Sequence, residues 1–343
     1  MIAQDATAAA TALLNQLQLG PPTRIDSLAG GRNNRTFRVA GPQGEWLLKQ
    51  YYRDPHGGRD RCASEWAWTT FCWQRGITWT PQPLACDANR QCALYEFILG
   101  RHLQRQEIAE GHVEQAAAFI EEVNRHRHDA AAGALSDAAE ACFSWAAHLD
   151  CVDRRMHRLE SIPVRDPLDA QMLRWLQGEL RPRWNAISAE LSRSVADDEL
   201  SRPLPAGLRC LSPSDFGFHN ALVTSSGRLR FVDFEYAGWD DPAKLICDFY
   251  WQQELPAPRS TQPQLVAALA EGVAGRALEA RVVRLFPVHG VKWCCLLLNE
   301  FLAEHRQRRE FARPAADAID RRAEQLALAQ QLLADVRAAG GLT

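Results

Sequence analysis

The sequence predicts an α+β protein of two lobes, a small β-rich N-terminal lobe and a larger, mainly helical C-terminal lobe. The chain has 343 residues, of which 46% are hydrophobic, and this length exceeds the roughly 100–200 residues of one domain. Short runs rich in β-branched and aromatic residues concentrate before residue 98, whereas long Ala-, Leu- and Arg-rich runs follow Gly100. We therefore expect lobes at residues 1–98 and 99–343.

The N-terminal lobe is predicted to contain a strand-rich region and two helices. Residues 3–19 have helical periodicity, which ends at Gly20 because two prolines follow. A second helix is expected over residues 61–74, closed by Gly76. Four short runs separated by turn residues are typical of strands, namely residues 25–28, 36–39, 45–51 and 93–98.

The C-terminal lobe is predicted to be helical with one interruption. Strand signals return only over residues 208–235. Helices are expected at residues 113–124, 138–148, 168–184, 264–277, 281–302 and 315–338.

Composition and charge exclude several classes of protein. The formal charge of −3 and the isoelectric point near 6.4 provide no positive field for nucleic acid or an anionic membrane. Residues 1–20 lack the basic and apolar regions of a signal peptide, and we expect no apolar stretch of about 18 residues. Ten cysteines without a Cys-x-x-Cys pair favour reduced core thiols. We expect a cytoplasmic protein with no nucleic-acid, membrane or obligate protein partner.

The segment 211–235 contains the residues with the clearest chemistry. Two short strands, 221–224 and 228–232, surround Ser225-Ser226-Gly227 and predict a tight hairpin. A symmetric hairpin would place Asn220 opposite Asp233, with strands roughly 4.8 Å apart. Amide and carboxylate oxygens are ligands that Mg²⁺ accepts beside water and phosphate. Asp215, five residues before Asn220, is placed to meet an incoming hydroxyl and take its proton.

This segment resembles the aminoglycoside phosphotransferase and choline kinase superfamily, which consists of protein-kinase-like small-molecule kinases with a D-x-x-x-x-N catalytic loop. The resemblance implies a protein-kinase-like fold, with Asp215 as catalytic base and Asn220 and Asp233 as metal ligands. The Asp-Phe-Gly at residues 215–217 lies in the catalytic loop and is not the metal-binding triplet, whose counterpart begins at Asp233. Members usually have a histidine two residues before the catalytic aspartate, and here that position is Pro213.

Lys49 lies within an apolar strand, where a lysine needs a partner, and Glu65 on the following helix is the natural one. The pair resembles the lysine and glutamate that hold the nucleotide phosphates in this superfamily. The Gly-Gly step at Gly30 and Gly31, with Asn33 close behind, lies where the superfamily has its nucleotide-positioning loop.

The connector between the lobes would bind the purine through its main chain. Such contacts fit ATP and GTP equally, so both remain open as the donor, together with Mg²⁺. The connector residues expected to contact the nucleotide are Glu96, Phe97 and Ile98.

The acceptor site is predicted less directly. Residues 281–313 contain seven basic residues and three acidic ones, a charge that would repel a polycationic aminoglycoside if it lines the site. A neutral or anionic sugar-like alcohol is therefore preferred. The candidate contacts are Lys292, Trp293, Asn299 and Trp239.

The predicted function is transfer of the γ-phosphate of a Mg-nucleotide to a hydroxyl of a sugar-like or amino-alcohol small molecule. The alternative is a catalytically silent pseudokinase that acts as a nucleotide-binding or interaction module. Pro213 favours the alternative, whereas Lys49, Asp215, Asn220 and Asp233 favour the enzyme.

Overall fold

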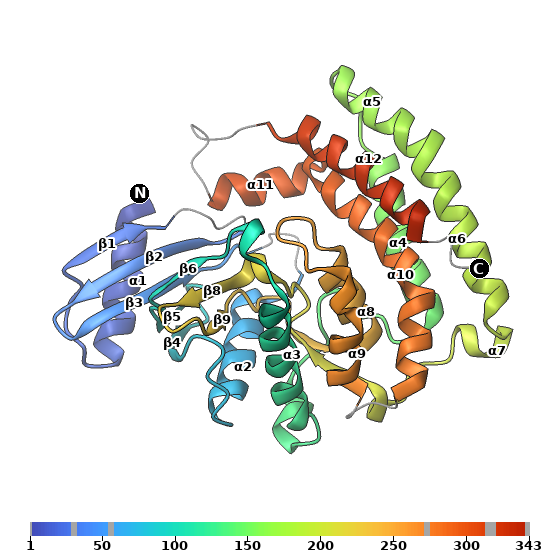
Figure 1. Cartoon of the computed structure of the whole chain (residues 1–343). Coiled ribbons are helices and arrows are strands. Elements are labelled where there is room, and N and C mark those ends of the chain that lie inside the picture. The colour runs from blue at the N-terminus through green and yellow to red at the C-terminus, as the bar shows by residue number, and fades with distance from the viewer. Residues whose placement is uncertain (1, 29–32, 54–57, 271–274, 313–319, 340–343) are drawn as a thin grey trace.

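The computed structural model describes residues 2–28, 33–53, 58–270, 275–312 and 320–339, and it confirms the two-lobed α+β architecture (Figure 1). The N-terminal lobe is built on an antiparallel sheet with strand order β1-β2-β3-β5-β4. We propose the boundary between the lobes at residues 98 and 99, directly after this sheet. Its strands are β1 Arg24–Ser27, β2 Arg35–Gly41, β3 Gly44–Gln50, β4 Pro83–Asp87 and β5 Cys92–Glu96.

Helices α1 (Ile2–Gln16) and α2 (Arg61–Trp73) cover opposite faces of this sheet. The apolar side of α1 packs on Leu48 and the side chains that share its face, whereas α2 begins against Tyr95 on the other face. Further along α2, Trp68 belongs to the large core of the C-terminal lobe. One helix therefore connects the sheet to the second lobe.

Helix α10 is the centre of the C-terminal lobe, and α8, α12 and α4 pack around it (Figure 1). Residues 276–301 are long and apolar enough to pass as a membrane span, which corrects the expectation that no such stretch exists, but 56% of the apolar window is buried inside the protein. The helices are α3 Glu110–Arg125, α4 Trp145–Glu160, α5 Pro167–Trp175, α6 Arg181–Ser194, α7 Asp197–Leu200, α8 Pro242–Trp251, α9 Gln262–Ala270, α10 Gly275–Leu297, α11 Ala303–Ala312 and α12 Arg322–Ala339.

Two small sheets support the loops between the lobes. Strand β6 (Gly100–His102) pairs with β8 (Ala221–Thr224), which pairs with β9 (Leu229–Phe231), while β7 (Cys210–Ser212) pairs with β10 (Gly238–Asp240). A Cβ atom on Gly100 would lie 3.0 Å from the carbonyl oxygen of Val223, so a larger residue there would push against β8.

Some element boundaries differ from the predictions. The helix expected at 138–148 begins instead at Trp145, because Ser144 caps it and Ala138 N donates to Trp239 O of β10 (2.8 Å). The helix expected at 168–184 continues to Ser194 through a π-helical segment, Leu176–Leu180. Strands β4 and β6 and helices α8 and α11 were not predicted as such.

The predicted hairpin is present, but the predicted register is wrong by one residue. Its three-residue loop is centred on Ser226, and Val232 N donates a hydrogen bond to Asn220 O (2.9 Å). Asn220 therefore lies opposite Val232, and Asp233 follows one residue beyond.

Candidate active site

Lys49 lies at the centre of an ion-pair cluster that joins the two lobes. Its Nζ lies 2.6 Å from Glu65 Oε2 on α2 and 2.5 Å from Asp233 Oδ1 beyond β9. The side chains of Lys49 and Glu65 are buried, whereas that of Asp233 is 37% exposed. The expected pairing of Lys49 with Glu65 is present, and the same lysine also holds the carboxylate of Asp233.

Asp233 is held in a backbone conformation that few residues adopt. Its φ is +69°, in the left-handed region, where aspartate and asparagine are tolerated better than most residues. Two residues on, Glu235 is fully buried and accepts hydrogen bonds from Asn33 Nδ2 (3.2 Å) and Asn34 Nδ2 (2.5 Å). Arg61 lies 3.6 Å from the same carboxylate. These contacts fix the Asp233 loop to the segment that follows residues 29–32.

The cluster contains more carboxylates than cations. Burial opposes the charge of Lys49, but Asp233 and Glu65 outweigh burial and raise its pKa. Burial raises the pKa of Glu65 to about 7 against the lowering influence of Lys49, and burial also raises the pKa of Glu235. A lysine between two carboxylates, with a third nearby, leaves negative charge that a bound cation would offset.

Asp215 lies on a strained loop after β7. Asp215 N donates to Pro213 O (2.9 Å) across Ser214, whose φ is +67°, the sign of the rare and strained γ-turn. Ser214 N in turn donates to Ser212 Oγ (3.0 Å). The loop at Pro213, where the resemblance leads us to expect a histidine, is therefore stabilised by main-chain and serine contacts.

Two residues that follow Asp215 keep it in place. His219 Nε2 lies 3.3 Å from Asp215 Oδ1, and Asn220 Nδ2 donates to Asp215 O (2.9 Å). Because the amide nitrogen of Asn220 is engaged, its Oδ1 is the atom left to meet a cation. The backbone at Gly217 approaches the His219 ring so closely that a Cβ would lie 2.8 Å from Nδ1.

The oxygen atoms of Asp233 and Asn220 are of the kind that Mg²⁺ accepts as ligands. Asp233 supplies a carboxylate, and Asn220 supplies an amide oxygen. In the part of the chain that the structure describes, no group of three or more His, Cys, Asp or Glu side chains is arranged to hold a metal alone. Magnesium commonly takes one or two protein oxygens and completes its shell with water and phosphate.

The connector follows β5 and leaves part of its main chain available. Glu96 N donates to Gln82 O (2.9 Å), and the Glu96 carboxylate pairs with Arg230 of β9 (2.6 Å). Among the described residues, no backbone hydrogen bond involves Phe97 or Ile98. The Glu96 side chain thus joins the two lobes, and the next two residues retain main-chain groups for a ligand.

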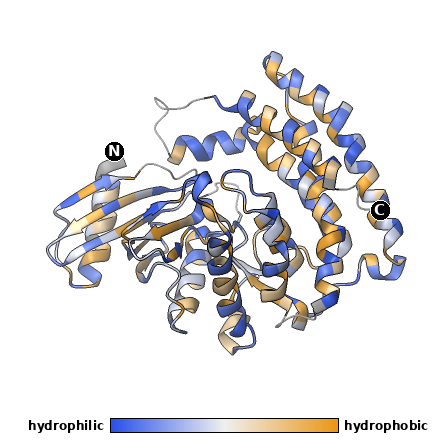
Figure 2. Ribbon diagram, in the orientation of Figure 1, coloured by the Kyte–Doolittle hydropathy of each residue, from blue (hydrophilic) through white to orange (hydrophobic). Residues whose placement is uncertain are grey.

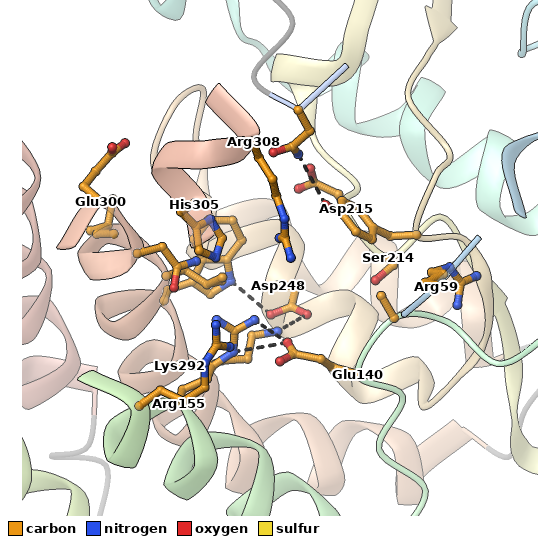
Figure 3. A pocket seen from close by; sticks show the side chains of 18 of the residues that line it. Arg59, Glu140, Arg155, Ser214, Asp215, Asp248, Lys292, Glu300, His305 and Arg308 are labelled. Atoms are coloured by element: carbon orange, nitrogen blue, oxygen red, sulfur yellow. Dashed lines mark hydrogen bonds and ion pairs between the residues drawn. The ribbon is translucent and has the colours of Figure 1, made fainter. Parts of the chain in front are cut away.

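A cavity of about 480 Å³ opens beside Asp215 (Figure 3). Its floor contains Asp248 of α8, which accepts from Lys292 Nζ (2.6 Å) and from Trp293 Nε1 (3.0 Å). Figure 3 shows Arg308 of α11 pointing into the cavity between His305 and Asp215. The lining residues on the side of α4, α10 and α11 include Arg155, Arg158, Lys292, Trp293, Asn299, Glu300, His305, Arg308 and Arg309.

The acceptor residues expected from sequence separate into two groups. Lys292, Trp293 and Asn299 line the cavity with Asp215. Trp239 does not line this cavity, because its indole Nε1 donates to Ala132 O (2.9 Å) and its strand pairs with β7. Lys292 is buried and pairs with Asp248.

Two of the predicted nucleotide contacts, Gly30 and Gly31, lie outside the described residues. Asn33 is described and contacts Glu235 and the hydroxyl of Tyr236 (3.3 Å).

Several residues of the site were not predicted. Arg59 donates to the carbonyl oxygens of Glu235 (3.0 Å) and Asp137 (2.6 Å), and so fixes the loop after Asp233. His219 could have been found, since it lies between the catalytic-loop residues in sequence. Arg59, Asp248 and Arg155 give no such signal, because only the fold brings them to the cavity.

Comparison with known proteins places these features in a family. The profile of the phosphotransferase enzyme family matches residues 24–286, which is more than half of the chain. No curated protein sequence matches the chain.

Solved structures share the fold at low identity. A choline/ethanolamine kinase family protein from Mesorhizobium loti is 18% identical with a TM-score of 0.60, and the match covers 98% of this chain and 100% of that chain. A Plasmodium vivax ethanolamine kinase is 12% identical with a TM-score of 0.61, over 96% of this chain and 88% of that chain. Spectinomycin phosphotransferase, solved with ADP and spectinomycin, is 12% identical with a TM-score of 0.61, over 96% and 98%. Since the family profile extends from the first strand of the N-terminal lobe into the central helix of the C-terminal lobe, the chain belongs to the phosphotransferase enzyme family.

Proposed function

We propose that the protein transfers the γ-phosphate of Mg-ATP or Mg-GTP to a hydroxyl of a sugar-like or amino-alcohol small molecule, with Asp215 as the base. The observation that carries the proposal is the convergence of Lys49, Glu65 and Asp233 between the lobes, beside the loop that positions Asp215. Phosphoryl transfer depends mainly on positioning and on stabilising charge, and this arrangement provides both.

Each side chain has a separate task in this proposal. Lys49, held by Glu65, binds the nucleotide phosphates, and the main chain at Phe97 and Ile98 binds the base. Asp233 and Asn220 hold Mg²⁺, which neutralises charge on the phosphates when it is bound. Asp215 accepts the proton of the acceptor hydroxyl as its oxygen attacks phosphorus. His219 and the Ser214 turn keep that carboxylate in place.

The pseudokinase alternative finds little support in the site. The alternative is based on Pro213, which stands where a histidine is expected. The loop after Pro213 nevertheless places Asp215 in the lining of the cavity. Lys49 and Glu65 form a buried ion pair, and burying such a pair costs desolvation energy. A protein that binds no phosphate gains nothing from this pair that would offset the cost.

The test separates the two aspartates. Asp233→Asn should lower both nucleotide affinity and turnover, because it removes a metal ligand. Asp215→Asn should leave Mg-nucleotide affinity near normal, while turnover falls by roughly 10²–10⁴-fold, the usual contribution of a positioned base. The measurements are calorimetric Mg-ATP and Mg-GTP binding beside nucleotide turnover with a panel of alcohols. Full turnover in Asp215→Asn would remove Asp215 as the base, and absence of nucleotide binding in the wild type would favour the pseudokinase.

A further inference from the structure

Two cysteines from different elements of the N-terminal lobe lie with their sulfur atoms in contact. Cys62 Sγ, in the first turn of α2, lies 3.6 Å from Cys86 Sγ on β4. Helix α2 lies beside β4, which is an edge strand of the sheet (Figure 1). All ten cysteines of the chain are free thiols. The two sulfurs therefore need only a short movement to form a disulfide, whose S–S bond is about 2.05 Å long.

The surroundings of the two thiols differ. Cys62 is fully buried, whereas Cys86 is partly exposed. A hydrogen bond from the Cys62 thiol to the Cys86 sulfur lowers the pKa of Cys86 against burial, which raises it. The same hydrogen bond, together with burial, raises the pKa of Cys62. Cys86 is thus the thiol that forms a thiolate and that an oxidant in solution can reach.

Cys92, the next cysteine in the sequence, does not compete with Cys62 for this position. It lies on the adjacent strand β5, opposite Asp87, the residue after Cys86. Its side chain packs in the cluster under α1, on one face of the sheet. Cys86 packs on the other face, in the cluster that contains Cys62 and Tyr95. The sheet therefore separates Cys92 from the pair and leaves Cys62 as the partner of Cys86.

The first turn of α2 also carries a residue of the candidate active site. Glu65, three residues after Cys62, pairs with Lys49 Nζ (2.6 Å). Lys49 Nζ also lies 5.2 Å from the ring centre of Tyr51, which packs in the same cluster as Cys62. Further along α2, Trp68 is anchored in the core of the C-terminal lobe, so a movement of Cys62 falls on the start of the helix. Such a movement acts on both members of the ion pair.

We propose that Cys62 and Cys86 form a reversible disulfide when a hydroperoxide oxidises them, and that this bond weakens nucleotide binding by displacing Glu65 relative to Lys49. Closing the bond draws the two sulfurs together by roughly 1.5 Å, and a misplacement of about 1 Å is enough to disturb a site of this kind. The formation of the disulfide depends only on the contact between the two thiols. Its effect on nucleotide binding rests on the proposed function.

The oxidation proceeds in two steps. The Cys86 thiol releases its proton, and its sulfur attacks one oxygen of hydrogen peroxide, which breaks the O–O bond and leaves a sulfenic acid and a hydroxide that takes up the proton. The Cys62 sulfur then attacks the sulfenic sulfur, the S–O bond breaks, and the Cys62 proton leaves with the hydroxyl group as water. The two thiols lose two electrons, which reduce one peroxide to two molecules of water. Dithiothreitol returns the two electrons by thiol–disulfide exchange.

The first measurement detects the disulfide. The reduced protein is treated with hydrogen peroxide and digested without reductant. Mass spectrometry should find the peptides that contain Cys62 and Cys86 joined with the loss of two hydrogen atoms, and dithiothreitol should separate them. The variants Cys62→Ala and Cys86→Ser should give no joined peptides. Two variants are used so that the test survives if one of them folds poorly.

The second measurement detects the consequence for the nucleotide. In calorimetric titrations with a non-hydrolysable Mg-ATP analogue, the oxidised wild type should bind about 10-fold more weakly than the reduced protein, since the charge-assisted contact of Lys49 with phosphate is disturbed. Dithiothreitol should restore the affinity. Cys62→Ala and Cys86→Ser should each bind the analogue equally before and after peroxide treatment. Cys92→Ala is the matched control, because Cys92 is a buried thiol on the neighbouring strand, and it should respond as the wild type does.

Three outcomes would overturn the inference. They are oxidation of Cys86 to a sulfinic or sulfonic acid with Cys62 unlinked, a disulfide that leaves the affinity for the analogue unchanged, or an equal loss of affinity in Cys86→Ser. Failure of the proposed function would be distinct, because the reduced wild type would then bind no nucleotide while the joined peptides would still form.

Discussion

At the scale of single residues, the buried position of Lys49 determines what its loss will do. Its ammonium group satisfies a buried glutamate as well as Asp233, so removing it leaves the Glu65 carboxylate without a counter-charge. The consequence is an effect on stability in addition to the expected effect on nucleotide binding.

Lys49→Met, which roughly preserves volume, should weaken Mg-ATP binding by about 10-fold or more, since a charge-assisted contact to phosphate is lost. It should also raise the pKa of Glu65 further, because burial then acts without the opposing lysine. Calorimetric binding measures the first effect, and urea unfolding at several pH values measures the second, because a raised pKa in the folded state changes how stability depends on pH. Arg38→Met is the control, since Arg38 pairs with Glu45 at the surface of the same sheet. Unchanged nucleotide affinity in Lys49→Met would exclude Lys49 from the site.

The sequence identifies site residues that lie close together along the chain, and it misses contacts between residues that lie far apart along it. Asp215 and Asn220 are five residues apart, so a local motif contains the whole loop. The contact between Arg35 Nε and Phe311 O spans 276 residues, and no local pattern predicts it. The contact between Trp239 Nε1 and Ala132 O spans 107 residues and is hidden from a local pattern for the same reason.

At the scale of elements, the predictions succeed where periodicity is long and fail where tertiary contacts determine the ends. Helix α2 was predicted over residues 61–74 and spans Arg61–Trp73. Its start agrees because Asp60 caps it, and its end lies within one residue of the prediction because the amphipathic pattern is continuous. Strand β6 has three residues, all exposed, and therefore carries no hydrophobic alternation. Helix α8 is buried on all sides, so its sequence lacks the polar face by which a surface helix is recognised.

Helix α8 depends on one aspartate at its start. Asp241 is the N-cap of α8, and its Oδ1 accepts from Ala243 N (2.8 Å). Its Oδ2 also accepts from Arg281 Nε (2.6 Å) and lies 3.1 Å from His148 Nε2. Despite burial, these partners lower the pKa of Asp241 to about 2. The cap is therefore also the anion of a buried cluster below the cavity floor.

Asp241→Ala should destabilise the fold by about 3–5 kcal/mol, the cost of removing one partner of a buried ion pair. Asp166→Ala removes an N-cap near the protein surface, on α5, and should cost only about 1 kcal/mol. Asp241→Asn keeps a capping oxygen and should lie between them. Denaturant unfolding of the three variants checks the order, and equal losses in Asp241→Ala and Asp166→Ala would contradict it.

At the scale of the whole molecule, buried histidines link stability to pH. Burial lowers the pKa of His289 to about 3, and His289 lies against Asp248 and His148 in the core of the C-terminal lobe. In the unfolded chain the pKa of this histidine is about 6.5. Below that pH the unfolded state takes up a proton that the folded state refuses, so this group's contribution to stability is complete above about pH 6.5 and is lost as pH falls toward 3.

His289→Gln should therefore reduce the acid sensitivity of the fold. Glu65 acts in the opposite direction because its folded pKa is raised, so the comparison of variant with wild type isolates the histidine. Between pH 7 and pH 5.5 the wild type should lose about 1 kcal/mol more than His289→Gln. Urea unfolding at the two pH values measures this difference, and parallel losses would show that His289 titrates normally in the folded protein.

Helix α11 contacts both lobes. Beyond Arg308 and His305, its last turn reaches the N-terminal sheet, where Arg35 of β2 donates to Phe311 O (2.7 Å) and its guanidinium group lies 4.1 Å from the Phe311 ring centre. Tyr52 packs on the same ring edge-to-face at 5.4 Å. Figure 2 shows α11 mostly in hydrophilic colours, so this contact is its main apolar attachment to the sheet.

The attachment makes α11 a thermodynamic link between the two ligands. A nucleotide that shifts the N-terminal lobe also shifts the wall that carries Arg308, so each ligand should tighten the other by the same factor, as reciprocity requires. Typical coupling would be about 5- to 150-fold. Acceptor affinity with and without the Mg-nucleotide analogue gives this factor, and Arg35→Ala, which spares the cavity lining, should bring it toward one. A factor of one in the wild type would mean that the two ligands bind independently, so that neither changes the affinity of the protein for the other.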